Sequence, residues 1–234
     1  TGSGGCIQVQ TTASLTFNTG TLQNCTATSS GGAISGSGTS SITISSSFLQ
    51  NNTSGTNGGA ISHSATTANL SISNSTFSGN RSGASGNAQG GAIFYSTNTT
   101  GSFSVTNTLF DNNRAQSSST QSRGGAIYFS ASGSITGTIS GSSFSNNQAF
   151  NGSSENRGGA IYKTGTGTLN VSSSAFTGNS STEFGGAMYV NAGNMDVTGS
   201  RIESNTAASG GGALYSVAGG VSVGDSLTGS CIVN

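Results

Sequence analysis

The sequence contains no proline and no tryptophan, and only 5% of its 234 residues are charged. Hydrophobic residues make up 31% of the chain, too few for the round core of an ordinary globular protein of this length. Six basic and six acidic residues cancel, so no net field would steer the protein to nucleic acid or to an anionic membrane. We therefore expect no nucleic-acid partner.

The chain also lacks any run of about 18 apolar residues and any charged-then-apolar leader, so we expect no membrane span. Because it begins at Thr1 rather than at methionine, we expect a processed product or a piece of a longer protein. The high net charge that accompanies disorder is missing too, and Phe and Tyr recur in phase. A thin, periodic core fits this composition better than disorder does.

The chain has only three cysteines, Cys6, Cys25 and Cys231, which lie near its two ends. An odd count in a chain rich in Ser, Thr and Asn suggests an oxidising compartment and one thiol left for another molecule. Ten Asn-x-Ser/Thr sequons are compatible with a secreted glycoprotein, although so much Asn, Ser and Thr also produces sequons by chance. They begin at Asn24, Asn51, Asn52, Asn69, Asn74, Asn80, Asn98, Asn151, Asn170 and Asn179.

What the sequence does contain is one short motif, Gly-Gly-Ala-Ile or a close variant, repeated eight times. The copies begin at residues 4, 31, 58, 90, 124, 158, 185 and 211. Their spacings of 26 to 34 residues indicate a solenoid of stacked repeats. We expect one domain over residues 1–234.

Each repeat carries a second motif, an apolar residue followed three positions later by Asn. The pairs are Phe48 with Asn51, Phe77 with Asn80, Phe110 with Asn113, Phe144 with Asn147, Phe176 with Asn179 and Ile202 with Asn205, preceded by Thr21 with Asn24. Before this motif, β-branched residues such as Ile72, Val105 and Ile139 alternate with Ser, Thr and Asn, which is typical of half-buried strands. We predict an all-β fold, a parallel β-helix solenoid of about eight turns with three short strands each.

The repeated positions predict ladders inside such a stack. We expect the residue after Gly-Gly-Ala and the Phe of the second motif to stack on their equivalents in neighbouring turns, while Asn amides link up the axis. The expected apolar ladders are Ile34, Ile61, Ile93, Ile127, Ile161, Met188 and Leu214, with Phe48, Phe77, Phe110, Phe144 and Phe176. The sequons at Asn24, Asn51, Asn80 and Asn179 would then have structural roles. Glycans would fall on loops, with Asn98 and Asn151 the best candidates.

Gly-Gly-Ala-Ile alternating in phase with Phe-x-x-Asn resembles the repeat of the chlamydial polymorphic outer membrane proteins. The resemblance extends over the whole chain, because both motifs recur from the first repeats to the last. It implies a right-handed β-helix in a secreted, surface or extracellular location, with a structural or adhesive use.

The acidic residues give little support for an enzyme. β-Helix glycosidases and lyases need two carboxylates within reach, or carboxylates with a metal and an Arg base. The six acids, Asp111, Glu155, Glu183, Asp196, Glu203 and Asp225, are scattered, and only Glu155 and Glu183 fall in neighbouring loops. The lone His63 has no matching partner, and the cysteines lack the spacing of metal ligands. We expect no catalytic residue, metal or cofactor.

Two surface features are candidates for binding. The residue after the ladder Ile is aromatic in five successive repeats, and this stripe would point outward if Ile points inward; Tyr inward and Ile outward is the alternative. The stripe is Phe94, Tyr128, Tyr162, Tyr189 and Tyr215. Long loops bring together Arg81, Arg114, Arg123 and Arg157, either as a binding cluster or as ordinary solvated charges.

The repeat phase suggests how copies would associate. Counting places Cys231 in the Asn column, and Cys6 of a second copy set after Asn234 would follow it at the spacing of the early repeats. We predict an extracellular or cell-surface structural protein that stacks head to tail into a fibre, with Cys231 bonded to Cys6 or Cys25 of the next subunit. The alternatives are a surface adhesin fragment that binds a receptor or glycan and, least favoured, a β-helix carbohydrate-active enzyme.

Overall fold

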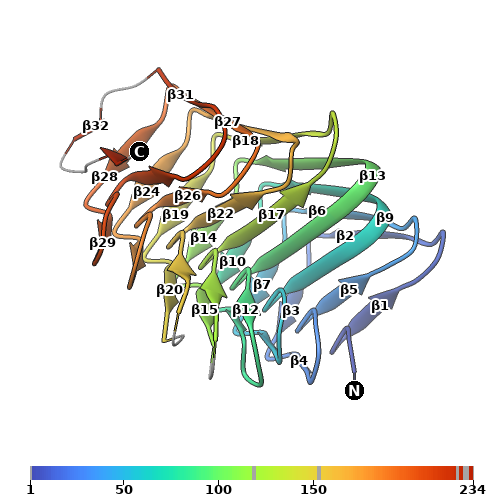
Figure 1. The fold of residues 1–234 in the computed structure, drawn as a ribbon. Coiled ribbons are helices and arrows are strands. Elements are labelled where there is room, and N and C mark those ends of the chain that lie inside the picture. Colours follow the sequence, from blue (N-terminus) through green and yellow to red (C-terminus); the bar gives the residue numbers. More distant parts are fainter. Residues whose placement is uncertain (1, 118–119, 152–153, 225–226, 229–231, 234) are drawn as a thin grey trace.

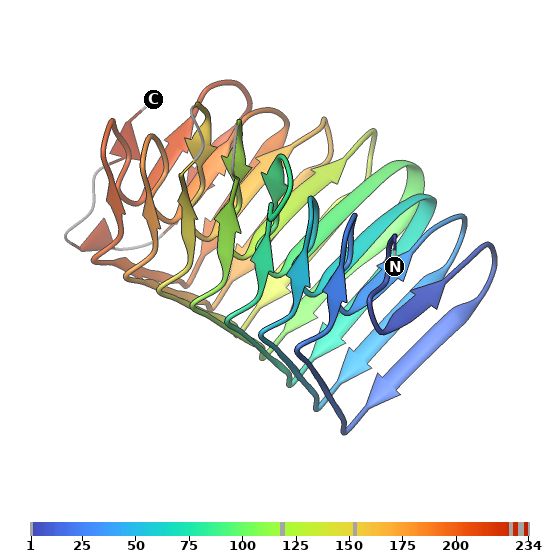
Figure 2. The ribbon, with the colours of Figure 1, turned by 90° about the horizontal axis from the view of Figure 1, so that it is seen from below.

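The structure, a computed structural model, describes residues 2–117, 120–151, 154–224, 227–228 and 232–233. It is a parallel β-helix, in which each turn of the chain pairs in parallel with the turns before and after it (Figure 1). The turns follow one another in chain order, so the blue first turn and the red last turn lie at opposite ends of the stack (Figure 2). The predicted fold, an all-β protein that forms a parallel β-helix, is confirmed.

The long sheet of the β-helix contains two strand positions of each turn. Those after the Gly pair are β1 (Ile7–Val9), β5 (Ile34–Gly36), β17 (Ile127–Ala131), β22 (Ile161–Thr164), β26 (Met188–Val190) and β30 (Leu214–Ser216). Those with the β-branched residues are β2 (Ser14–Asn18), β6 (Ser41–Ser45), β18 (Thr136–Ser140), β23 (Thr168–Ser172), β27 (Asn194–Thr198) and β31 (Val221–Val223). In two turns one strand runs through both positions, β9 (Ile61–Ser73) and β13 (Ile93–Thr106).

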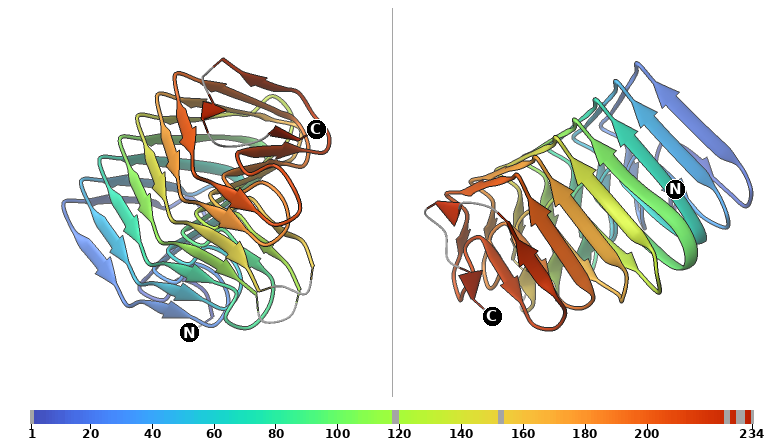
Figure 3. Two further views of the ribbon diagram at one scale, coloured as in Figure 1. Left: turned by 90° about the vertical axis from the view of Figure 1, so that its left-hand side faces the viewer. Right: turned by 90° about the horizontal axis from the view of Figure 1, so that it is seen from above.

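Three smaller sheets complete the turns, and the views of Figure 3 show their strands stacked in the same order. The phenylalanine sheet contains β3 (Thr21–Gln23), β7 (Phe48–Gln50), β10 (Thr76–Ser78), β14 (Leu109–Asp111), β19 (Ser143–Ser145), β24 (Ala175–Thr177), β28 (Arg201–Glu203) and β32 (Leu227–Thr228). The asparagine-side sheet contains β4 (Thr26–Ala27), β8 (Thr53–Ser54), β11 (Arg81–Ser82), β15 (Arg114–Gln116), β20 (Gln148–Phe150), β25 (Ser180–Ser181) and β29 (Thr206–Ala207). The loop sheet contains β12 (Ala88–Gln89), β16 (Ser122–Arg123) and β21 (Asn156–Arg157).

The asparagine-side sheet is a fourth strand position that the prediction of three strands per turn missed. Its strands are only two or three residues long. They carry small inward residues such as Ala115 and Ser82, which are buried, and polar outward ones such as Arg114. Such short segments give no period-two signal long enough to separate a strand from a loop.

The two predicted apolar ladders form the core, with one correction. Every expected member of the Ile ladder is buried, and the rings of Phe110 and Phe144 stack with centroids 4.7 Å apart, those of Phe144 and Phe176 4.6 Å apart. Phe48 does not belong to this ladder. Its side chain is 49% exposed, and Leu49 pairs with Phe77 in its place.

The asparagine ladder is confirmed from Asn80 onward and shifts by one residue before it. Asn113 Nδ2 donates to Asn147 Oδ1 at 3.0 Å and to the Phe77 carbonyl of the preceding turn at 2.9 Å, while Asn113 N donates to the same Oδ1. The ladder consists of Asn52, Asn80, Asn113, Asn147, Asn179 and Asn205. Asn24 and Asn51 instead lie at exposed corners with positive φ.

A ladder of hydroxyls at the opposite end of the phenylalanine strand was not predicted. Ser142 Oγ accepts from the backbone N of Thr108 at 3.2 Å and donates to the carbonyl of Ser140 at 2.9 Å. The equivalent residues are Ser47, Ser75, Thr108, Ser142, Ser174 and Ser200. The hydroxyls of five of these residues, Ser47, Ser75, Ser142, Ser174 and Ser200, each accept from a backbone N of the preceding turn, which satisfies that donor at the corner.

The Gly pair turns the chain for the two reasons that the motif suggested. Gly124 has φ of 68°, which favours glycine, and the second residue, Gly125, packs against backbone. A Cβ on Gly125 would lie 2.0 Å from the carbonyl oxygen of Gly159 in the next turn. The corner therefore requires the absence of a side chain.

Cys6 and Cys25 form a disulfide within the first turn, with their Cα atoms 5.7 Å apart. Cys25 occupies the first place of the asparagine ladder, since its backbone N donates to Asn52 Oδ1 at 2.9 Å. This disulfide contains both of the cysteines that were predicted as partners for Cys231 of another subunit. Cys231 itself lies outside the described residues.

The head-to-tail count needs a correction. It rested on Asn24 and Asn51, and because Cys25 and Asn52 hold the ladder positions, the counted spacing is one residue too long. In addition, Ile232 of β33 (Ile232–Val233) pairs with Leu214, the position of the Ile ladder. The proposed junction through Asn234 and Thr1 lies outside the described residues.

Candidate functional site: an aromatic file under an arginine and glutamate cover

The predicted aromatic stripe forms one continuous file on the outer side of the strands that follow the Gly pair. Its members are Phe94, Tyr128, Tyr162, Tyr189 and Tyr215. Successive ring centroids are 5.0, 5.2, 5.2 and 5.6 Å apart and the rings are nearly parallel. Since Ile127 and its equivalents face the core, the outward orientation of the file agrees with the alternation of side chains along a strand.

The file is not the open surface that a bound sugar would need. Phe94 and Tyr128 are each 8% exposed, and Tyr162 and Tyr189 each 2%. The loop sheet and the segment around Phe184 cover it, and the Phe184 ring lies 4.5 Å from that of Tyr215. The expectation of an exposed stripe is therefore corrected, because loops that vary in sequence fold back over it.

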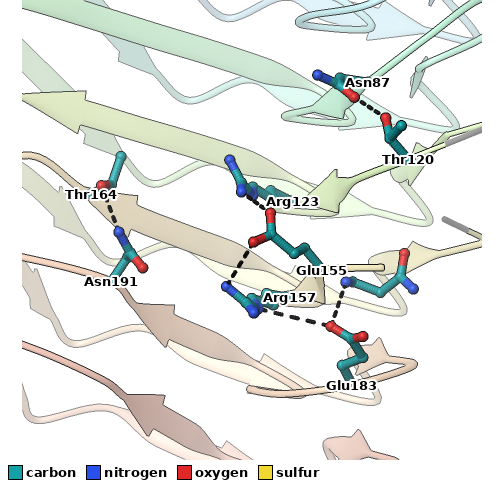
Figure 4. Close-up of polar contacts among 9 residues, drawn as sticks. Asn87, Thr120, Arg123, Glu155, Arg157, Thr164, Glu183 and Asn191 are labelled. Carbon is teal, nitrogen blue, oxygen red and sulfur yellow. Dashed lines mark hydrogen bonds and ion pairs between the residues drawn. The ribbon is translucent and has the colours of Figure 1, made fainter. Parts of the chain in front are cut away.

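Arginine and glutamate side chains make up this cover (Figure 4). The guanidinium of Arg123 lies over the Tyr162 ring at 5.3 Å, and that of Arg157 lies over Tyr189 at 5.1 Å. Glu155 forms ion pairs with both arginines, and Glu183 is 3.8 Å from Arg157. Glu183 also accepts from the backbone N of Asn156 at 3.0 Å.

The electrostatics of this site favour packing over proton transfer. Burial raises the pKa of the Tyr128, Tyr162 and Tyr189 hydroxyls, while the nearby arginines oppose that rise. The hydroxyls therefore stay protonated at neutral pH, and both carboxylates are bound to arginine. Glu155 and Glu183, the one neighbouring carboxylate pair in the sequence, thus have a structural role in the cover.

A histidine and a lysine lie in the core, although no sequence motif predicted that they would be buried. His63 is fully buried beside Ser40 Oγ, 3.2 Å from Nε2, and burial lowers its pKa to about 4. Lys163 is also buried, and its Nζ donates to the carbonyls of Gly165 at 2.6 Å and Ala192 at 2.7 Å; burial lowers its pKa to about 8. Both occupy the same inward file as Tyr95, so only their neighbours in adjacent turns could have revealed their burial.

The other predicted residues are distributed as follows. The arginine cluster divides into two pairs, Arg123 with Arg157 on the loop sheet and Arg81 with Arg114 on the asparagine-side sheet. Asn98 is exposed where β13 shifts register against β9, and Asn151 is exposed with its Nδ2 bonded to the Ser117 carbonyl at 3.2 Å. Within the described ranges, no group of His, Cys, Asp and Glu is arranged to hold a metal ion.

Four segments of the chain match the Chlamydia polymorphic membrane protein repeat, residues 46–64, 107–130, 141–164 and 199–217. The predicted resemblance to these proteins is confirmed. Each matched segment runs from the hydroxyl corner, through the phenylalanine strand and the asparagine ladder, to the strand after the Gly pair. The polymorphic membrane protein repeat thus corresponds to the part of the turn in which all the ladders are made.

No curated protein and no solved structure matches the chain. The repeat match indicates a passenger of a surface or outer membrane protein. Among the described residues, no helix is long and apolar enough to cross a bilayer.

Proposed function

We propose that the chain is a rigid structural segment of an extracellular or surface passenger, which holds its loops and lateral faces away from the cell. The observation that supports this role is the continuity of the asparagine ladder, in which the amides from Asn52 to Asn179 each link three turns. A stack whose turns are connected in this way resists bending between neighbouring repeats. The repeat match supports the surface location.

Labelling of intact cells of the source organism tests the location. Antibodies raised against the folded chain should label unpermeabilised cells, and external protease should remove the signal. If the label appears only after permeabilisation, the surface role is wrong. An adhesive use would add saturable binding of the purified chain to a target surface, which a rigid spacer alone does not require.

A fibre that stacks end to end is the second candidate. One edge of β1, β2 and β3 has no paired strand among the described residues, and Leu15, Phe17 and Leu22 at that edge are only partly buried. Another turn, from a second copy or from further repeats, would cover them. Negative-stain microscopy of the purified chain should then show rods of variable length, and uniform short particles at high concentration would contradict the fibre.

The predicted bond from Cys231 is tested separately. Non-reducing electrophoresis gives a series of multimers that collapses on reduction to one band at 22.8 kDa only if Cys231 displaces one cysteine of the Cys6–Cys25 disulfide. A single band under both conditions would exclude a covalently linked fibre. A non-covalent stack would then be tested by the negative-stain microscopy alone.

A further inference from the structure

Two arginine pairs each lie on adjacent strands of a short parallel sheet, but the side chains around the two pairs differ. In each pair the arginines are directly opposite on adjacent parallel strands, Arg123 with Arg157 and Arg81 with Arg114. Neighbouring strands are about 4.8 Å apart, so each pair brings two positive charges close together. Like charges opposite each other destabilise a sheet unless something neutralises them.

The first pair is neutralised within the chain, and the second is not. Glu155 and Glu183 form ion pairs with Arg123 and Arg157. Among the described residues, neither Arg81 nor Arg114 forms an ion pair, and Arg114 donates to the Asn112 amide oxygen at 3.2 Å.

The carboxylate closest along the chain does not help the second pair. Asp111 Oδ1 accepts from Ser145 Oγ at 2.6 Å and from Asn146 Nδ2 at 3.3 Å, both in the following turn.

The fold does not require arginine at these positions. The same outward file of the asparagine-side sheet contains Thr53 before Arg81 and Gln148 after Arg114, with the same parallel pairing. Arg114 is exposed and Arg81 partly so, and the inward neighbours of both are buried small residues. The positive charges therefore face solvent without a structural task.

We propose that Arg81 and Arg114 bind a single oxyanion group, sulfate or carboxylate, on an acidic glycan. Guanidinium groups bind such anions with two parallel hydrogen bonds, and one anion between two arginines removes their mutual repulsion. The flanking Thr53 and Gln148 supply neutral hydrogen-bonding groups, which suit the hydroxyls of a sugar.

Other anionic partners fit this surface less well. Nucleic acid binding rests on many phosphate contacts or on exposed aromatic rings, and this site has two charges while the aromatic file is covered. Anionic membranes attract clusters of about four to eight basic residues. An isolated pair among neutral polar side chains matches an isolated charge on a hydroxyl-rich ligand.

Three dextrans with the same neutral backbone test the proposal: dextran sulfate, carboxymethyl dextran and unmodified dextran, each immobilised for biolayer interferometry. The wild-type chain should bind one or both charged polymers and not the neutral one. The double substitution Arg81→Gln with Arg114→Gln should weaken that binding by about tenfold or more. Which charged polymer binds more tightly identifies the anion as sulfate or carboxylate.

Arg201→Gln is the charge control, because Arg201 is exposed and already paired with Glu203 at 2.8 Å. It should change binding by less than about twofold. Equal losses in this variant and the double variant would reduce the effect to general charge attraction and overturn the site. Absence of wild-type binding to both charged dextrans would overturn it as well.

Folding and ligand class are checked in parallel. The double Gln variant should melt no lower than the wild type, since it removes a repulsion, and a double Lys variant should bind more weakly than wild type because it keeps the charge without the planar fork. Tighter binding to single-stranded DNA or to anionic vesicles than to either charged dextran would overturn the glycan assignment. None of these results depends on where the protein is displayed.

Discussion

The asparagine corner and the glycine corner of each turn bend the chain by opposite means. At the asparagine corner a side chain fills the bend, and the amide of Asn147 accepts from the turn before and donates to the turn after. At the glycine corner nothing fills the bend, and the backbone of Gly125 lies against that of Gly159. One corner depends on a side chain being present, and the other on its being absent.

The difference explains where the repeat tolerates change. Between the hydroxyl ladder and the asparagine ladder, spacing is constant because every position has a partner in the next turn. Between the asparagine ladder and the Gly pair, the chain adds β12, β16 and β21 in three long turns without disturbing either corner. The surface features of the molecule, including both arginine pairs, arise next to this variable segment.

The largest effect should come from filling the glycine corner. A Cβ at residue 125 would lie 2.0 Å from the Gly159 oxygen and 2.4 Å from the Gln148 nitrogen. We expect Gly125→Ala to lower the free energy of unfolding by about 4 kcal/mol or more, measured by urea denaturation. Gly133→Ala is the control, because a Cβ there has no atom within 4 Å, so that substitution carries only the cost of the positive φ of Gly133. Similar losses in the two variants would contradict backbone packing as the cause.

Removing a ring between the two corners should cost nearly as much. Phe144 is fully buried between Phe110 and Phe176. We expect Phe144→Ala to lower the free energy of unfolding by about 3 to 5 kcal/mol in the same assay. The exposed Phe48 provides a matched substitution, and Phe48→Ala should cost less than about 1 kcal/mol. A reversal of this order would restore Phe48 to the ladder.

Emptying the asparagine corner tests the other half of the comparison. Asn147→Ala would leave the backbone N and the Nδ2 of Asn113 without their acceptor inside the protein. Because buried donors without partners are costly, we expect a loss of about 2 to 4 kcal/mol. The exposed Asn98 serves as the control, with an expected change below about 0.5 kcal/mol on replacement by Ala. A small loss for Asn147→Ala would mean that water replaces the amide.

The smallest of the four effects depends on pH and concerns the inward file next to the glycine corner. Burial lowers the pKa of His63 from 6.5 to about 4, so the folded protein resists a proton that the unfolded chain accepts. The stability contributed by neutral His63 is complete above pH 6.5 and is lost as the pH falls to about 4. We expect a loss of about 2 to 3 kcal/mol over this interval, absent in His63→Phe. Equal pH profiles for the two proteins would contradict it.

The sequence predicted the ladders well where each motif had a single reading. It misplaced one repeat because Phe48 and Leu49 are both apolar and Asn51 and Asn52 are both asparagine, so two registers satisfied the motif. The β-branched residues would have decided between them, since Ile44 precedes Leu49 by five residues as Ile72 precedes Phe77, whereas a serine lies two residues before both Phe48 and Leu49.

The cover over the aromatic file could not be predicted in the same way. Which rings are exposed depends on how loops of unequal length fold back, and repeat spacing holds no information about that. The same limit applies to the arginines, whose proximity was predicted while their division into a neutralised and an unneutralised pair was not. Pairing with Glu155 and Glu183 depends on the loop sheet, which no motif marked.

The asparagine ladder also gives the stack a direction. The backbone N of Cys25 donates to Asn52 Oδ1, and in every later step both the backbone N and Nδ2 of one Asn donate to Oδ1 of the next, as far as Asn179 and Asn205. The last member of the ladder differs, because Asn205 Nδ2 donates to the carbonyls of Phe176 and Glu203. The stack is therefore polar along its axis: each turn directs amide donors toward the turn that follows it and an amide acceptor toward the turn that precedes it.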